Sequence, residues 1–401
     1  MTTDNKLPAV RPIEVVPFRR DDGEIYFALH DPAQLSTDSL AISPAGYFVL
    51  AHLDGEHTAA DIQAAFREHA GMELPAAEIH QLVEVLDAAL LLQGDRVLQV
   101  LAERRAAYQA APARDNRDHA PSADELRTEI AGLLARGVAA PVRDVRGIIA
   151  PHLDYARGGP CYADAYATLA QAPPADRYVI LGTNHFGEST AVVATRKDFW
   201  TPLGAVQTDR EFIARLESAL GTSICTGEHD HAREHSVELQ VHILQTIMGS
   251  RPFEIVPLLC PGACGPTGTA PIDGHGPDLH AVAQALANLV ADGDRRTVLI
   301  AGADLSHVGQ RFGDPEPTTP EFLAAVARTD RELLDMLERR EEEAFVAKLA
   351  ADDNPTRVCS SGGIFTMLQA LPGRSCKVLS YHQAVDMAHE THVTCTAAVV
   401  W

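Results

Sequence analysis

Three apolar segments of the sequence end in side chains that can bind a metal ion or carry a proton. His152 follows GIIAP, His185 follows VILGTN, and Asp304 and His307 follow VLIAGA. The functional crevice of an open α/β sheet lies outside the carboxyl ends of its strands, so we expect these side chains to converge. One histidine at a strand end is more often structural, but three such ends together favour a site. Imidazole suits iron, copper, zinc and nickel, and Asp154 or Asp304 could fix the tautomer of a metal-bound histidine.

Cys359 could add a thiolate to this group. The residues after it, SSGGIFTMLQAL, predict a helix, and the dipole at a helix N-terminus stabilises a thiolate. A bound metal would deprotonate the thiol further. The alternative is that Cys359 is a small buried residue at a strand-to-helix turn, and the residues by themselves leave both interpretations open.

The segment EHSVELQ brings further ionisable side chains to the start of a predicted helix. Glu234 and Glu238 are four residues apart, so we expect them to share one face of that helix. His235 by itself would be interpreted as a solvated residue at a helix start, or as an acid/base residue if it faces the pocket. The neighbouring His229 and His231 are expected to lie in a loop.

From Val142 onward, short apolar runs alternate with helical segments. The runs that we interpret as buried strands are VRGIIAPH, RYVILGTNH, FEIVPLLCPG, RTVLIAGADLSH, CKVLSYHQ and CTAAVVW. The helical segments between them are YADAYATLAQ, REFIARLESAL, SVELQVHILQTIM, HAVAQALANLVADG and FLAAVARTDRELLDML. This alternation predicts an α/β fold with a mostly parallel sheet covered by helices on both faces.

The N-terminal part of the chain has a different organisation. Its segments predict, in order, a strand at EIYFALH, a helix at SPAGYFVLAHLDG, a helix at AADIQAAFREHAG capped by Thr58, a helix at PAAEIHQLVEVLDAALLL and a returning strand at GDRVLQVL. We therefore expect an extension at residues 1–23 and a small winged-helix-like domain at residues 24–102. The segments LDGEHTAADI and VLDAALLL resemble the PqqD-like family, whose modules capture a peptide as an added strand. A small appended module without a ligand of its own is the alternative.

A linker is expected between this domain and the rest of the chain. Residues 103–121 mix Ala, Arg, Asp and Pro, which is typical of a helix that runs into a linker. Ser122 then caps a helix that opens the second domain, at residues 122–401. Two domains agree with the length, because 401 residues exceed what one hydrophobic core usually organises.

Composition limits the class of partner. A net charge of −22 would repel a phosphate backbone, so we expect no binding to nucleic acid. The first residues lack a basic region followed by an apolar run, and no stretch approaches the roughly 20 apolar residues that span a bilayer. We therefore expect no membrane association and a cytoplasmic location. The odd number of cysteines, seven, argues against a disulfide framework.

Five segments together resemble a known family. IIAPHLDYARGG, VILGTNHFG, EHSVELQ, ADLSHVGQRFGD and NPTRVCSSGG resemble, in this order, the motifs of the Memo family, which includes the AmmeMemoRadiSam system protein B. The resemblance spans roughly residues 143–401 and implies a fold shared with the class III extradiol dioxygenases. Those enzymes hold non-haem Fe(II) with two histidines and a glutamate, and Memo proteins have a cysteine in place of the glutamate.

Carried over by motif, the resemblance implies a role for each site residue. His152 in APH, His185 in NH and Cys359 in NPTRVCSSGG become the metal ligands. His307 in DLSHVGQRF matches the acid/base histidine of the dioxygenases, and His235 matches a pocket histidine of the family. The chain departs from the family at one point, because Phe186 stands where a second histidine usually follows NH or SH.

These observations lead to a functional hypothesis with two alternatives. The leading one is a Memo-like, metal-dependent redox protein that binds Fe(II) or Cu, with Asp304 and His307 handling protons and an unknown small-molecule or peptide substrate. An extradiol ring-cleaving dioxygenase is less favoured, because a thiolate in place of the carboxylate shifts the potential and O₂ reactivity of the iron. A non-catalytic protein that binds a peptide or phosphopeptide in the same crevice is the other alternative. The AmmeMemoRadiSam association further implies radical-SAM partner proteins.

Overall fold

The computed structural model describes residues 5–20, 23–36, 40–117, 121–262, 267–293 and 295–401. These residues form two compact units, Met1–Ala110 and Ala111–Trp401. The segment expected to be a linker, residues 103–121, contains the end of helix α4 (Asp95–Ala110), the last helix of the first unit. It also contains strand β4 (Ala113–Asp115), which belongs to the sheet of the second unit. Residues 118–120 of that segment lie outside the described residues.

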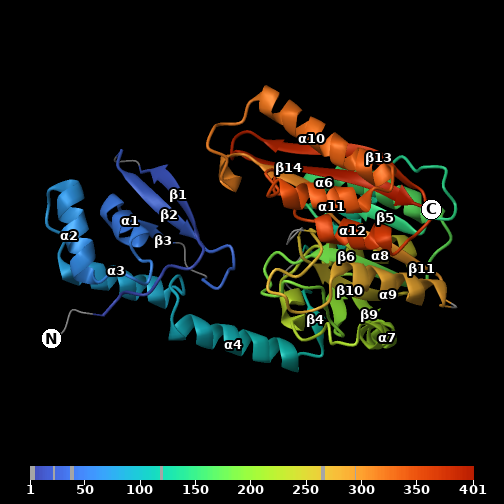
Figure 1. Cartoon of the computed structure of the whole chain (residues 1–401), viewed down its shortest axis with the longest axis horizontal. Coiled ribbons are helices and arrows are strands. Elements are labelled where there is room, and N and C mark those ends of the chain that lie inside the picture. The colour runs from blue at the N-terminus through green and yellow to red at the C-terminus, as the bar shows by residue number, and fades with distance from the viewer. Residues whose placement is uncertain (1–4, 21–22, 37–39, 118–120, 263–266, 294) are drawn as a thin grey trace. The chain divides into compact units, whose positions relative to one another are not determined.

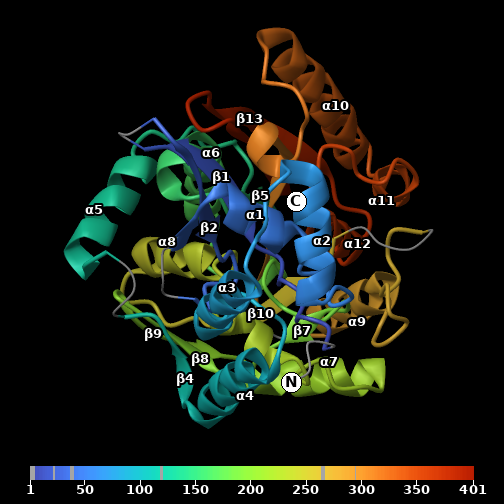
Figure 2. The ribbon, with the colours of Figure 1, turned by 90° about the vertical axis from the view of Figure 1, so that its left-hand side faces the viewer.

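The first unit is an antiparallel sheet followed by helices (Figure 2). Its sheet has the strand order β1 (Glu14–Arg19), β2 (Ile25–His30) and β3 (Leu40–Ile42). The helices are α1 (Pro44–Ala51), α2 (Ala59–Ala70), α3 (Ala76–Ala88) and α4. Thr58 caps α2 as expected, through a reciprocal pair of hydrogen bonds with Asp61.

The strand predicted at GDRVLQVL is wrong, because these residues begin helix α4. The run continues into AERRAAYQA, whose Ala, Arg, Glu and Gln are strong helix formers, so a helix that starts at Asp95 propagates through it. The strands of this unit therefore precede its helices, whereas a returning strand after the helices was expected.

The second unit is built on one large sheet with a parallel centre and antiparallel margins (Figure 1). The parallel strands are, in spatial order, β5 (Gly147–Ala150), β11 (Thr297–Gly302), β6 (Arg177–Thr183), β10 (Glu254–Cys260) and β9 (Gly204–Thr208). The antiparallel partners at the β5 margin are β12 (Asp304–Val308), β13 (Cys376–Asp386) and β14 (Thr391–Val400). Near the other margin lie β7 (Val193–Ala194), β8 (Asp198–Thr201) and β4.

Helices cover both faces of this sheet, which confirms the predicted fold class. Alternate residues of each central strand enter opposite cores: Val179 and Leu181 of β6 pack on one side, and Tyr178 and Ile180 on the other. The first face is covered by α7 (Arg210–Leu220), α9 (Leu279–Ala291), α10 (Pro320–Glu338), α11 (Glu342–Ala351) and α12 (Ser361–Gln369). The second is covered by α5 (Ala123–Leu134), α6 (Tyr155–Gln171) and α8 (Glu238–Met248). Within the described ranges, none of the helices combines the length and apolarity that crossing a bilayer requires.

Candidate metal centre

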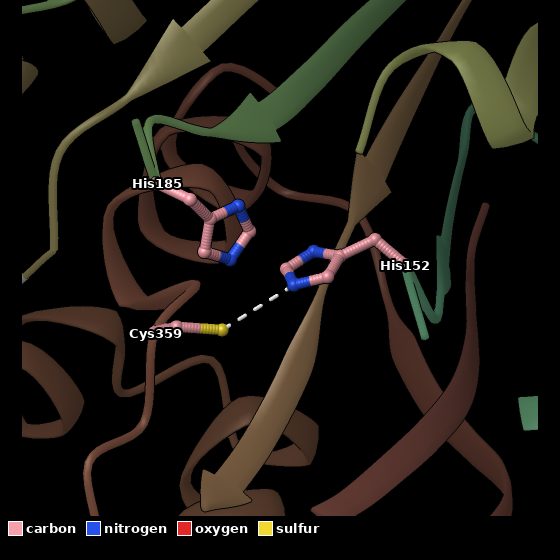
Figure 3. Close-up of side chains that lie close together, drawn as sticks. All are labelled: His152, His185 and Cys359. Atoms are coloured by element: carbon pink, nitrogen blue, oxygen red, sulfur yellow. Dashed lines mark hydrogen bonds between the residues drawn. The ribbon is translucent and has the colours of Figure 1, made fainter. Parts of the chain in front are cut away.

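His152, His185 and Cys359 lie together at the carboxyl edge of the parallel strands (Figure 3). His152 follows β5 and His185 follows β6, each by two residues, and Cys359 precedes α12. One ligand atom from each of the three lies within 4.8 Å of the others, and the Cys359 Sγ is 3.4 Å from the His152 Nε2. His152 is buried, whereas His185 reaches the surface and Cys359 is half-buried, so the group opens to solvent on one side.

The segment EHSVELQ packs directly against the strand ends that carry these residues. A β-carbon at Gly182 would lie 2.4 Å from the Ser236 Oγ, and one at Gly302 would lie 2.7 Å from the Ser236 backbone oxygen. Side chains at these two positions would therefore displace Ser236. The Ser236 hydroxyl in turn accepts a hydrogen bond from the Thr183 backbone N–H at 3.0 Å. Glycines in β6 and β11 thus let the segment reach the site.

His152 is oriented by the backbone of the neighbouring strand. Its Nδ1 donates to the carbonyl oxygen of Gly302 at 2.8 Å, which fixes the tautomer and leaves the Nε2 lone pair facing Cys359. Asp304 is buried beside it: one carboxylate oxygen accepts the His152 backbone N–H at 3.1 Å, and the other lies 3.4 Å from Nε2. Burial raises the pKa of Asp304 to about 6.

His185 is oriented by a carboxylate. Its Nδ1 lies 3.1 Å from each carboxylate oxygen of Glu234, and its backbone N–H donates to the same group at 3.0 Å. The expectation that Glu234 and Glu238 share a helix face is wrong, because α8 begins only at Glu238. Asp154, a candidate partner in the sequence, instead caps α6 and binds Arg157. The partners that fix the two rings are thus Gly302 and Glu234.

Cys359 has the electrostatic environment of a thiolate. Burial alone would raise its pKa, but the neighbouring His152 and His185 lower it to about 6. The predicted helix after it is present as α12. Ser360 fastens this turn to the strand ends, because its hydroxyl accepts the Asp304 backbone N–H at 3.1 Å and lies 3.0 Å from the Thr183 hydroxyl.

The three donors fit one metal ion. Nitrogen and sulfur ligands at about 2.0 to 2.3 Å from a tetrahedral ion lie roughly 3.5 Å apart, and the Cys359 to His152 separation is 3.4 Å. Each imidazole has its Nδ1 occupied, so its Nε2 is the atom left for an ion. Three protein ligands would leave a coordination position for another molecule.

The other predicted site residues lie around this group. The His235 ring stacks on that of His185 at 5.2 Å between centroids and lies 5.7 Å from that of His152. His307, on β12, is held by its Nδ1 to the backbone oxygens of Leu305 and Arg357, at 3.1 and 3.2 Å. Burial lowers the pKa of both His235 and His307, which favours neutral rings.

Two features near the site were not evident in the sequence. A second set of ligand atoms, from His185, Glu234 and His235, also lies within 4.8 Å of one another. Phe186 stands beside it, 46% exposed, with its ring 5.8 Å from that of His185 and 6.2 Å from that of His235. The signal for Glu234 was present in the segment EHSVELQ, but its role as a histidine partner depends on tertiary contacts.

Comparison with known proteins identifies related sequences. A family model described as "Memo-like protein" matches residues 119–400. A "MEMO1 family protein" of Aquifex aeolicus is 27% identical over 91% of this chain and 92% of that protein, and one of Methanococcoides burtonii is 32% identical over 70% of this chain and 94% of that protein. A solved structure of the uncharacterized Escherichia coli protein JW3007 covers 64% of this chain and 100% of its own at 13% identity, with a TM-score of 0.39, which is too low to support an argument. Since the family model spans more than half of its length, the chain belongs to the Memo-like protein family.

Proposed function

We propose that this protein is a Memo-like, metal-dependent redox protein that holds Fe(II) or Cu through His152, His185 and Cys359. The observation that carries the proposal is the convergence of two imidazole rings and the Cys359 sulfur, whose ligand atoms lie within 4.8 Å of one another while both rings are held through Nδ1. A thiolate with two imidazoles suits iron and copper, and softer ligands disfavour magnesium or calcium.

The surrounding residues supply orientation and proton transfer. When bound, the ion would offer an open position at which O₂ or a substrate is activated. Glu234 holds His185 in place, and Asp304 holds the backbone of His152. The Nδ1 of His307 is engaged with backbone oxygens, so its Nε2 is the atom that can accept or give a proton.

A ring-cleaving dioxygenase is the second candidate, and one observation favours it. His185, Glu234 and His235 form a two-histidine, one-carboxylate set, the ligand type of non-haem Fe(II) oxygenases. Against it, the Glu234 carboxylate already accepts the backbone N–H groups of His185 and Ser236, at 3.0 and 2.9 Å. A metal held by His152, His185 and Cys359 would not take the Glu234 carboxylate from these backbone N–H groups, so we favour that set.

Metal analysis of anaerobically purified protein separates these possibilities. Wild type is compared with Cys359→Ala and His235→Ala, and O₂ uptake is measured on the Fe(II) and Cu(I) forms. Our proposal predicts stoichiometric metal in the wild type, loss in Cys359→Ala and retention in His235→Ala. The reverse pattern would assign the carboxylate set. No metal in the wild type would contradict both and leave a binding protein whose crevice takes a peptide.

A further inference from the structure

Arg114 is a buried arginine that binds the segment carrying Glu234. It lies on β4 and is 2% exposed. Its Nε donates to the His231 carbonyl oxygen at 2.7 Å, and its Nη2 donates to the Glu234 carbonyl oxygen at 2.7 Å and to a Glu238 carboxylate oxygen at 2.8 Å. Its guanidinium also lies 5.1 Å from the centre of the Phe199 ring. One side chain thus fixes three points between His231 and Glu238.

This contact bears on the metal centre through Glu234. Arg114 holds the carbonyl group of Glu234, and the carboxylate of the same residue holds the ring and backbone of His185. Residues 233–237 lie between the 3₁₀ turn η1 (Glu228–Ala232) and α8, so no helix or strand of their own fixes their backbone. The position of the Glu234 carboxylate therefore depends on what holds this backbone from outside.

Loss of Arg114 would remove a hydrogen-bond donor from several groups. Glu238 is buried, and although burial alone would raise its pKa, His242 and Arg114 lower it to about 2. Without Arg114 its carboxylate would keep the Asn116 Nδ2, which donates to it at 2.6 Å, but would lose the guanidinium charge that balances it. The His231 and Glu234 carbonyl oxygens would also lose their donor. A lysine offers a single ammonium in place of a planar fork, so it cannot reach all three acceptors in this geometry.

Arg114 comes from a part of the chain outside the residues that match the family model. That match begins at residue 119, and β4 at Ala113–Asp115 follows directly on the first unit, which ends at Ala110. β4 nevertheless pairs with β8 in the large sheet. We infer that Arg114 is a positioning residue for the metal centre, which sets metal affinity and geometry by holding Glu234 against His185. The inference rests on the proposed metal site.

Anaerobic titration with Co(II) tests this inference, because the visible spectrum of cobalt reports ligand geometry and thiolate coordination. The variants are Arg114→Met and Arg114→Lys, beside Arg177→Met as a control. Arg177 is likewise a buried arginine, 6% exposed and paired with Asp209, but it lies at the opposite end of β6 from His185. Unfolding curves of the metal-free proteins measure the general loss of stability in each variant.

We expect Arg114→Met to weaken Co(II) binding by about 10- to 100-fold and to shift its spectrum, as loss of a ligand's supporting partner does. Arg114→Lys should restore less than half of the lost affinity for Co(II), measured on a logarithmic scale. Arg177→Met should bind Co(II) like the wild type. Unchanged affinity and spectrum in folded Arg114→Met would overturn the inference, as would an equal loss in Arg177→Met. If Arg114→Met does not fold, Arg114→Lys is judged by the same criteria. Failure of the wild type to bind Co(II) would instead overturn the metal site itself, and the inference with it.

Discussion

The two histidines of the proposed metal centre are held by different kinds of structure. His152 donates its Nδ1 proton to the backbone of β11 at Gly302, in the centre of the sheet. His185 relies on the side chain of Glu234, on an irregular segment that Arg114 and Ser236 hold in place. A backbone carbonyl of a central strand cannot be removed by substitution, whereas a carboxylate can. The ring of His152 therefore has a partner that substitution cannot remove, whereas the ring of His185 depends on a replaceable side chain. His185 is also the one of the two that lies at the surface.

Removal of a proposed ligand should have the largest effect on metal binding. Both Cys359→Ala and His185→Ala should reduce metal content of the purified protein at least 100-fold, because two remaining donors bind weakly. Elemental analysis measures the content. Cys225→Ala is the matched control, since burial raises the pKa of that thiol to about 12 and it lies outside the site. Full metal in either ligand variant would refute the assignment of that residue.

The segment that supports His185 should be sensitive to acid. His231 lies in η1, not in the expected loop, and burial lowers its pKa to about 4. The unfolded chain, with a histidine pKa near 6.5, then binds more protons between pH 6.5 and 4, so stability is present above this window and is lost as the pH falls through it. The loss should reach about 3 kcal/mol at pH 4.

Denaturant unfolding of metal-free wild type and His231→Gln between pH 7 and 4 measures this effect. The glutamine amide can still donate to the Val193 carbonyl oxygen, which accepts from His231 Nε2 at 3.1 Å. The variant should show a smaller decline, and the difference between the two proteins should grow as the pH falls. Parallel pH curves would show that His231 does not titrate in the predicted way.

The two carboxylates that support the histidines, Glu234 and Asp304, should differ in their contribution to metal affinity, with the larger contribution from Glu234. Glu234→Gln should weaken metal binding about 10-fold, because it removes the charge that orients and polarises His185. Asp304→Asn should weaken it less, because the amide oxygen can still accept the His152 backbone N–H and Gly302 still fixes the ring. Competition titrations against a chelator give both affinities. Equal losses would show that the two histidines are not held differently.

His307→Ala should have the smallest effect on the metal and a large one on chemistry. His307 is not one of the three donors, so metal content should stay at the wild-type level. Loss of an acid/base group should lower O₂ consumption by about 100-fold or more. Oxygen-electrode assays on the metal-loaded proteins measure this. Unchanged uptake would remove His307 from the proton pathway.

Much of this arrangement follows from the sequence. Strand ends at His152 and His185 could be located because VRGIIAPH and RYVILGTNH are apolar runs that stop at polar residues. The family resemblance is confirmed, whereas the roles given to the site residues stay predictions. GDRVLQVL was misassigned because its apolar residues fit either period, and the helix-forming residues after it decide the outcome.

The supports of His185 could not be predicted, for a physical reason. β4 is only three residues long and carries no periodicity, so Arg114 looked like part of a linker. Its partners lie more than 115 residues away in the sequence. The link from Glu234 to His185 likewise exists only once β6 and the segment before α8 are packed together. Local sequence patterns indicate which residues stand at strand ends as candidate ligands. They do not indicate which distant residue holds each of these side chains in place.

X-ray absorption spectroscopy of the iron- or copper-loaded protein tests the central claim most directly, because it counts the sulfur atoms bound to the metal. We predict one sulfur ligand beside nitrogen ligands in the wild type, and no sulfur ligand in Cys359→Ala. A wild-type centre with only nitrogen and oxygen ligands would contradict the account and would move the metal to His185, Glu234 and His235.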